Sequence, residues 1–390
     1  MSLIVNPHLD RDRVYSDAER AVISLAGYER AAAEIRAWPD YQPTPLHSLS
    51  GLAGNLGIGQ LWVKDESERF GLGSFKALGG AYGVLRVLEQ ELGADREALS
   101  HTVTVTCATD GNHGRSVAWG ARTHGSGCVI YLPGHVTDRR VEEIAAFGAR
   151  TVRVDGTYDQ AVAMADADAR SNGWFVVSDH SYEGYMDVPR LVMQGYTVMV
   201  DEMLGQTPDG ARPTHVFLQG GVGGVAAAVC GHLWELDGAA RPLLTIVEPE
   251  EADCLYQSAA AGMPTHASGS LHTIMGGLSC GEISSLAWTV LDQGADVFMT
   301  AEDTRVEPLM RRLAEGRDGD VPVVAGESGV AGLAGLESVS EDPSLRSALR
   351  LGADARVLVV ITEGATDADS YERIVGRTAR DVASSRYREK

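Results

Sequence analysis

Short apolar segments alternate with longer amphipathic segments along most of the chain, and this alternation predicts its secondary structure. Short runs of apolar and β-branched residues bounded by polar or glycine residues indicate buried strands. Such strands are predicted over residues 61–65, 102–108, 128–132, 149–154, 174–178, 215–218, 243–247 and 357–361. Apolar side chains at helical spacing predict helices over residues 16–36, 77–88, 115–123, 158–171, 191–204, 225–236, 302–315 and 329–338, with a loop and helix over 133–147.

Because predicted strands and helices follow one another in turn, the pattern is typical of an α/β fold. In such folds a mostly parallel sheet is covered by helices on both faces. Residues 263–282 depart from the pattern, since they are rich in glycine, serine and histidine, and they predict a loop.

Net charge, apolar runs and cysteine spacing each argue against particular partners or compartments. The 390-residue chain carries a formal net charge of −21, which argues against nucleic acid and anionic membrane as partners because both would repel it. No apolar run approaches the length of a membrane span, and residues 1–13 lack the apolar core of a signal peptide. Five cysteines without a C-x-x-C pair favour free thiols and a cytoplasmic protein, and no metal-ligand spacing is found.

Glycine-bearing turns follow four of the predicted strands. They lie before Lys76, over 109–114, over 219–224 and over 362–364. In a parallel sheet the carboxyl ends of the strands share one edge, and ligands bind there. The four turns therefore predict one cleft.

Lys76 lies between a glycine-rich turn and the first residues of a predicted helix. The partly positive N-terminus of a helix disfavours an ammonium and favours a neutral amine. A neutral amine is what a Schiff-base nucleophile needs. From this position alone, a solvated surface lysine is the alternative interpretation.

The stretch Gly220-Gly221-Val222-Gly223-Gly224 joins a predicted strand to a predicted helix. Its unhindered N–H groups and the helix N-terminus can cradle a phosphate. Gly221-x-Gly223-x-x-Ala226, with Glu248 closing the next strand, also fits a dinucleotide fingerprint, and tight helix–strand packing is a third interpretation. The other turns favour a compact phosphate-bearing aldehyde, because a dinucleotide explains neither Lys76 nor Asn112.

Pyridoxal phosphate is that cofactor. Its aldehyde needs an amine, its phosphate a cradle, and its ring nitrogen and phenolic oxygen need hydrogen-bonding partners. Lys76 supplies the amine and the glycine stretch 220–224 the cradle. Asn112 can donate to the phenolic oxygen, and the hydroxyl of Thr362 can meet the ring nitrogen.

These motifs carry a family resemblance. Ser74-Phe75-Lys76, Gly111-Asn112-His113-Gly114 and the glycine stretch 220–224 resemble the fold-type II pyridoxal phosphate enzymes, the group of the tryptophan synthase β-subunit and threonine dehydratase. Within that group the chain is similar to the diaminopropionate ammonia-lyase family over roughly residues 40–375. The segments that carry this similarity are 69–80, 108–115, 182–185 with 193–196, 273–278 with 280–282, and 362–364.

The resemblance implies roles for particular residues. Lys76 would be the Schiff-base lysine and the base for an L-substrate, and Asp110 the base for the D-isomer. Asp179 would hold the second ammonium of the substrate, and Phe75 would belong to the cofactor site. From the residues alone, Asp110 and Asp179 are also good turn or cap residues. Further substrate contacts are implied for Ser74, Thr109, Tyr182, Met275 and Gly276.

The resemblance also implies an architecture and a reaction. The fold would be fold-type II, with a large domain (1–80 and 186–390) and a small domain (81–185) that each contain a mostly parallel sheet, and with the cofactor in the cleft. The reaction would be α,β-elimination of L- and D-2,3-diaminopropionate to pyruvate and ammonia, by a homodimer. Cys254 and Cys280 are implied as a possible disulfide. Tyr182, where the family usually has tryptophan, marks a departure near the substrate site.

Three alternatives stay open at this point. A β-replacement or elimination enzyme acting on another β-substituted alanine uses the same residues. An NAD-dependent dehydrogenase would depend on residues 221–248, and an amino-acid sensor without catalysis would not need Lys76.

Overall fold

The computed structural model describes residues 1–109, 111–134 and 136–386. The chain divides into two compact units. The large unit contains residues 1–25, 42–74 and 199–390, and the small unit contains residues 26–41 and 75–198. The predicted domains placed residues 26–41, 75–80 and 186–198 in the large domain instead. These segments join the small unit because they pack on it: a Cβ on Gly83 would lie 3.0 Å from Cγ2 of Val192, one on Gly80 would meet Ser116, and the ring of Trp38 lies 5.8 Å from that of Trp119.

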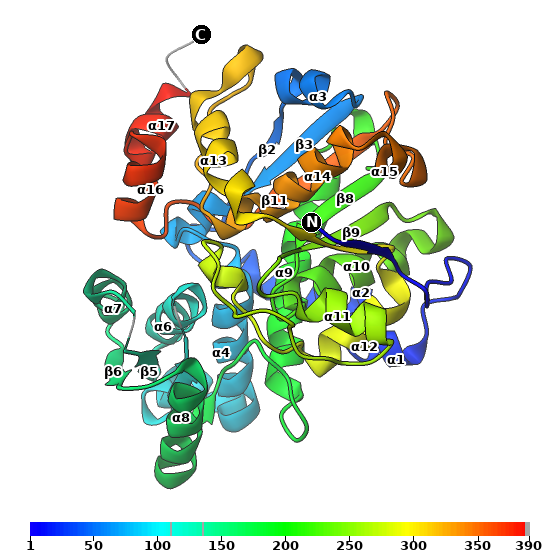
Figure 1. The fold of residues 1–390 in the computed structure, drawn as a ribbon. Helices are drawn as coiled ribbons and strands as arrows, with labels where there is room; N and C mark the ends of the chain where they lie inside the picture. Colours follow the sequence, from blue (N-terminus) through cyan, green and yellow to red (C-terminus); the bar gives the residue numbers. More distant parts are fainter. Residues whose placement is uncertain (110, 135, 387–390) are drawn as a thin grey trace. The chain divides into compact units, whose positions relative to one another are not determined.

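A seven-stranded sheet forms the centre of the large unit. Five neighbouring strands run parallel and one antiparallel strand closes each edge. In spatial order the strands are β1 (Leu3–Val5), β10 (Val297–Ala301), β9 (Leu243–Pro249), β8 (His215–Gln219), β11 (Arg356–Ile361), β3 (Gln60–Asp65) and β2 (Leu46–Ser48), as Figure 1 shows. The parallel strands are buried on both faces, which explains their almost continuous apolar sequences.

Helices cover this sheet. Glycines let one of them, α14 (Ala331–Glu341), lie very close to the strands, since a Cβ on Gly332 would be 2.7 Å from the carbonyl oxygen of Phe217. The other helices of the large unit are α1 (Asp17–Arg20), α3 (Ser50–Leu56), α10 (Gly224–Asp237), α11 (Cys254–Ala261), α12 (Ser285–Gly294), α13 (Val306–Glu315), α15 (Pro343–Ala348), α16 (Ala368–Val375) and α17 (Ala379–Ser385).

The small unit contains a four-stranded parallel sheet. Its strands lie in the order β6 (Arg150–Val154), β5 (Gly127–Pro133), β4 (Thr104–Ala108) and β7 (Phe175–Val176). Two of its helices meet through glycine, because a Cβ on Gly120 would lie 2.6 Å from Cα of Ala81. The helices are α2 (Leu25–Ile35), α4 (Lys76–Leu92), α5 (Arg96–Leu99), α6 (Asn112–His124), α7 (Asp138–Ala145), α8 (Tyr158–Asn172) and α9 (Asp187–Gln206), of which α9 continues into the large unit.

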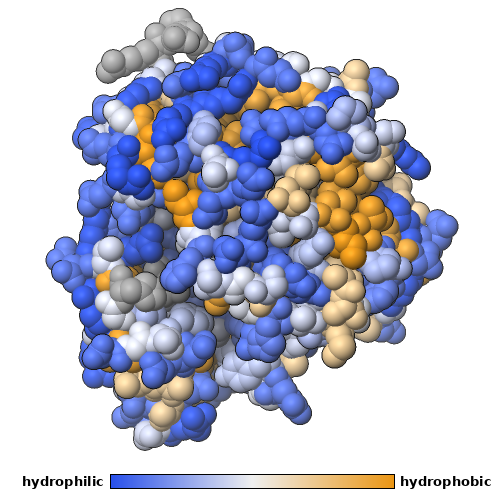
Figure 2. Space-filling view, viewed as in Figure 1, coloured by the Kyte–Doolittle hydropathy of each residue, from blue (hydrophilic) through white to orange (hydrophobic). Residues whose placement is uncertain are grey.

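The predicted α/β fold with two mostly parallel sheets is confirmed. The helix predicted over 16–36 is wrong in one respect, because it is interrupted between α1 and α2. There Ile23 leaves the helical path and packs against Gly231, where a Cβ would lie only 2.9 Å from it. No helix within the described ranges is long and apolar enough to cross a membrane. Hydrophilic residues cover most of the face seen in Figure 2, in keeping with the high net charge.

Candidate active site

The turn that precedes Lys76 is fixed inside the large unit. Phe70, Gly71 and Gly73 adopt left-handed backbone conformations, which bring the chain sharply round after β3. Ser74 forms an isolated bridge with Glu363, and the carbonyl oxygen of Gly73 accepts the N–H of Gly364 at 2.9 Å. Two of the predicted strand-end turns, those before Lys76 and at 362–364, are therefore direct neighbours.

A buried ionic network also fixes the turn that precedes Lys76. The guanidinium of Arg69 donates to Glu66 at 2.7 Å and to Glu202 of α9 at 2.7 and 2.8 Å. Lys64 of β3 donates to Glu202 at 2.7 Å and to the carbonyl oxygen of Thr44 at 2.7 Å. All four ionic side chains are at most 2% exposed. Removing one partner would leave a buried charge unpaired, so this network strongly favours a single turn conformation.

Lys76 is the first residue of α4 in the small unit, as the sequence predicted. Its ammonium forms an ion pair with the carboxylate of Asp179, which follows β7. His113 of α6 places Nδ1 3.8 Å from the same carboxylate, and its Nε2 lies 2.8 Å from the carbonyl oxygen of Val177. Asp179 and Lys76 are thus brought together from positions far apart in the sequence.

The electrostatics of this cluster favour a charged Asp179. Burial would raise the pKa of Asp179, but His113 and Lys76 outweigh it and hold the pKa well below its usual range. Burial lowers the pKa of His113 despite its carboxylate neighbour, which favours the neutral imidazole. The hydroxyl of Tyr196 has no hydrogen-bond partner among the described residues, and its ring lies 4.7 Å from that of Phe75. Sequence reasoning missed His113 and Tyr196 as neighbours of the lysine.

The turn at 109–114 starts helix α6. The hydroxyl of Thr109 accepts the N–H groups of Gly111 at 3.0 Å and Gly114 at 3.1 Å, so this side chain holds the turn that leads into the helix. Asn112 is the first helical residue. Asp110, predicted as a second base, lies outside the described residues.

The glycine loop 220–224 connects β8 to α10 in the large unit. The N–H groups of Gly221, Val222 and Gly224 have no hydrogen-bond partner in the described part of the chain. Gly221 and Gly223 have φ values of +61° and +91°, which side chains other than glycine rarely adopt. Three free N–H groups at a helix N-terminus form an anion cradle, so these residues fit a phosphate group.

Side chains cannot be added to this loop without displacing its neighbours. A Cβ on Gly220 would lie 2.7 Å from Cγ of Glu248, and one on Gly223 would lie 2.9 Å from Cβ of Ala287. Glu248 accepts the N–H groups of Leu255 and Tyr256 at 3.0 and 2.8 Å, and burial raises its pKa to about 8. The NAD-dependent dehydrogenase alternative needs the Glu248 carboxylate to bind a ribose. In the structure this carboxylate instead accepts N–H groups at the start of α11.

Thr362 ends β11 next to the glycine loop. Its hydroxyl oxygen accepts the Nε2–H of Gln219, the last residue of β8, at 2.8 Å. Because that oxygen already accepts, its proton is available to an acceptor such as a pyridine nitrogen. Sequence reasoning missed Gln219, although it directly precedes the loop.

The remaining predicted residues are distributed around these turns. Tyr182 is 41% exposed and stacks on Tyr185, in the small unit. Met275 is buried and Gly276 exposed, in the large-unit loop 262–282, which side-chain oxygens of Asp253, Glu251 and Asp303 hold in place. No disulfide joins Cys254 to Cys280 in the structure, and the disulfide implied by the resemblance stays a prediction. Residues 1–109, 111–134 and 136–386 contain no group of side chains suited to hold a metal ion.

Comparison with known proteins decides the family. A family model described as "Pyridoxal-phosphate dependent enzyme" matches residues 37–363, which is most of the chain. The chain belongs to this family of pyridoxal-phosphate dependent enzymes. Its three free loop N–H groups and its helix-start lysine suit the phosphate and aldehyde of the family's cofactor.

Relatives within the pyridoxal-phosphate dependent enzymes are similar over almost their full length. A diaminopropionate ammonia-lyase of Escherichia coli strain K12 is 40% identical over 88% of this chain and 89% of the relative. One crystal structure of the Escherichia coli enzyme, in complex with an aminoacrylate–pyridoxal phosphate azomethine intermediate, is similar with a TM-score of 0.88 and 38% identity over 96% of both chains. Another, in complex with D-serine, has a TM-score of 0.87 and 36% identity over 97% of this chain and 98% of the other.

Proposed function

We propose that this protein is a diaminopropionate ammonia-lyase, which eliminates the β-amine of 2,3-diaminopropionate and yields pyruvate and ammonia. The observation that carries the proposal is the pairing of Lys76 with Asp179. It shows that a carboxylate beside the lysine can hold an ammonium, and a diamino acid brings a second ammonium to such a site. Similarity to the Escherichia coli enzymes supports the same substrate.

When bound, pyridoxal phosphate withdraws electrons from the α-carbon of an amino acid. Lys76 would hold the cofactor through its aldehyde, and its Nζ, once the substrate amine has displaced it, would accept the α-proton of the L-substrate. The glycine loop would bind the phosphate through the N–H groups of Gly221, Val222 and Gly224, which no described residue engages. Asn112 would donate to the phenolic oxygen, and Phe75 would line the cofactor.

Thr362 would donate to the ring nitrogen through the hydroxyl proton that Gln219 leaves free. A hydroxyl does not protonate the ring as a carboxylic acid would, so the ring withdraws electrons less strongly. Expulsion of a leaving group at Cβ is then favoured over transamination.

Substrate recognition would depend on Asp179, with Ser74, Thr109, Tyr182, Met275 and Gly276 around the substrate. For D-2,3-diaminopropionate we propose Asp110 as the base. The D-serine complex of the Escherichia coli relative supports acceptance of D-amino acids. We further propose that the protein is a cytoplasmic homodimer. Light scattering on the purified protein tests the dimer by measuring its mass.

Replacing Lys76 with alanine tests the proposed function. The wild-type protein is expected to carry an absorbance band that borohydride bleaches and to release pyruvate from 2,3-diaminopropionate. Lys76→Ala should lose both, while Lys64 and the other lysines remain. Bleachable cofactor in the variant would assign the Schiff base to another lysine. If the wild-type enzyme released pyruvate only from other β-substituted alanines, the proposed substrate would be wrong.

A further inference from the structure

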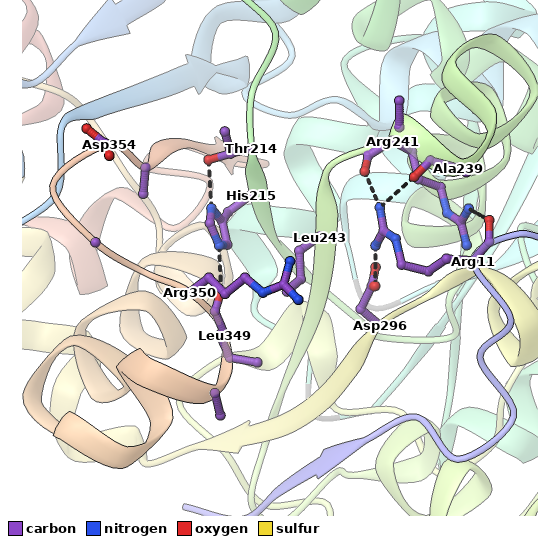
Figure 3. Close-up of a pocket in the computed structure, with 14 residues that line it drawn as sticks. Arg11, Thr214, His215, Ala239, Arg241, Leu243, Asp296, Leu349, Arg350 and Asp354 are labelled. Atoms are coloured by element: carbon purple, nitrogen blue, oxygen red, sulfur yellow. Dashed lines mark hydrogen bonds and ion pairs between the residues drawn. The ribbon is translucent and has the colours of Figure 1, made fainter.

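The cavity shown in Figure 3 lies in the large unit, where the parallel strands begin, and its volume is about 650 Å³. Several of its side chains bond to the fold itself. His215 places Nδ1 2.7 Å from the hydroxyl of Thr214, and Arg11 forms an ion pair with Asp296. These contacts indicate a structural role for this edge of the sheet. The contacts that bear on the reaction lie in the small unit, in the residues that precede Asp179.

A tight turn over residues 182–185 fixes the side chain of Tyr185 in the small unit. The N–H of Tyr182 donates to the carbonyl oxygen of Tyr185 at 3.3 Å, and the N–H of Tyr185 donates to that of Tyr182 at 2.9 Å. Gly184 has a φ of +86°, which residues other than glycine rarely adopt. The two tyrosine rings stack, with centroids 5.2 Å apart and 27° between their planes. The Tyr185 ring is therefore held both by its own turn and by its neighbour.

The hydroxyl of Tyr185 bridges two of the residues that lead to Asp179. It donates to the carbonyl oxygen of Val176 at 2.9 Å and accepts the N–H of Ser178 at 2.9 Å. Burial raises the pKa of Tyr185, so the hydroxyl keeps the proton that it donates. Strand β7 ends at Val176, so the residues after it need partners other than a neighbouring strand. One phenol oxygen provides such partners on both sides of the strand end.

The residue between these two is also held. The N–H of Val177 donates to the carbonyl oxygen of Thr106 at 2.8 Å, and its own carbonyl oxygen lies 2.8 Å from Nε2 of His113. Each of the three residues before Asp179 therefore has a paired backbone group. Because Asp179 comes directly after them, the place of its carboxylate depends on these contacts.

We propose that Tyr185 is a positioning residue, whose hydroxyl fixes the end of β7 so that the Asp179 carboxylate can select substrates with a second ammonium. Tyr185 acts through Asp179 and needs no contact with the substrate. Precise placement matters, because the attraction between a carboxylate and an ammonium weakens with the distance between them. The inference rests on the proposed function, in which Asp179 holds the β-ammonium of 2,3-diaminopropionate.

Tyr185→Phe tests this role, because it keeps the stacked ring and removes only the hydroxyl. In the holoenzyme the ratio of kcat/KM for 2,3-diaminopropionate to that for serine should fall at least about fivefold, the size of one lost hydrogen bond. In an Asp179→Asn background the same change should leave the ratio unaltered, because the carboxylate through which Tyr185 acts is gone.

Tyr131→Phe is the matched control. It also removes a tyrosine hydroxyl from the small unit, one that bonds to Asp168 of α8. It should keep the wild-type ratio. An unchanged ratio in Tyr185→Phe, equal losses on both substrates, or a further fall in the double variant would each overturn the proposal.

Crystal structures of the wild-type and Tyr185→Phe holoenzymes give a readout that does not depend on the substrate. We expect the Asp179 carboxylate to be displaced in the variant, while the strands of the small sheet keep their positions. An Asp179 that stays in its wild-type place would show that Tyr185 does not position it. If the wild-type enzyme does not turn over 2,3-diaminopropionate, the proposed function fails, and these structures alone decide the role of Tyr185.

Discussion

Three side chains in the small unit determine one another's charge states: those of Lys76, Asp179 and His113. The ammonium and the carboxylate are paired, and the imidazole beside them is kept neutral by burial. A carboxylate whose pKa is held this low remains charged throughout the neutral range. At the residue scale, a charged Asp179 is what the proposed binding of a substrate ammonium requires.

Asp179→Asn is expected to damage turnover of 2,3-diaminopropionate more than turnover of serine. The reason is that serine has no second ammonium for the carboxylate to hold. The ratio of kcat/KM for the two substrates should fall at least about tenfold, the size of one lost charge-assisted contact. Asp187→Asn, at an exposed acid that begins α9, is the control. Equal losses on both substrates would show that Asp179 supports only the lysine.

Asp110→Asn is expected to impair the D-isomer selectively. Losing a positioned base costs about 10²–10⁴-fold in rate, so the D/L ratio of kcat/KM should fall at least about a hundredfold. Asparagine caps a helix nearly as well as aspartate, so the melting temperature should stay the same. An unchanged D/L ratio would leave Asp110 as a turn or cap residue.

At the scale of elements, the glycine loop between β8 and α10 positions the phosphate cradle. Gly223→Ala forces an alanine into a left-handed conformation and brings its Cβ within 2.9 Å of Ala287. We expect the affinity for pyridoxal phosphate to fall at least about tenfold and the melting temperature to drop, as strain of about 1–3 kcal/mol is introduced. Fluorescence titration of the apoenzyme measures the affinity.

Gly205→Ala is the matched control for the loop variant. Gly205 lies in α9, where a Cβ would meet nothing within 4 Å, so alanine should be neutral or slightly stabilising. If Gly223→Ala bound the cofactor as tightly as Gly205→Ala, the loop would not be the phosphate cradle.

Elements with a strong local pattern could be predicted from the sequence. The strands β3, β8 and β11 are continuous apolar segments, and each was predicted to within one residue of its observed bounds. The edge strands β1 and β2 were missed because each has three residues and depends on pairing with a distant strand.

Glycine turns revealed where the cofactor residues lie along the chain. They could not reveal that Asp179 meets Lys76 or that Gln219 orients Thr362, since these contacts arise from the fold.

At the scale of the whole molecule, two buried acids link stability to pH in opposite directions. Burial raises the pKa of Glu248 from its ordinary 4.5 to about 8, so folding favours its protonated form. Its contribution to stability is fully present below about pH 4.5 and is lost as the pH rises through about 8. Burial also opposes ionisation of Asp65, but His47 and Arg386 outweigh it and lower that pKa, so Asp65 stabilises above its unfolded pKa and this contribution is lost in acid.

Glu248→Gln is therefore expected to flatten the pH dependence of the melting temperature between pH 5 and 9. The wild type should lose stability across this interval as Glu248 ionises, and the uncharged amide cannot ionise. Calorimetric scans of both proteins at several pH values measure the effect. Parallel curves for variant and wild type would show that Glu248 is already ionised in the native protein.

The strand order of the large sheet has a consequence for how the chain is made. β11 lies between β8 and β3, so β3 cannot join the parallel strands until residues 356–361 have left the ribosome. At elongation rates of about 5–20 residues per second this delay is roughly 15–60 seconds after β3 itself emerges. Most of the small unit, residues 75–198, is complete long before then. Nascent chains should therefore carry a folded small unit and a β3 that can pair only with β2, and chaperones that shield exposed strand edges would act during this interval.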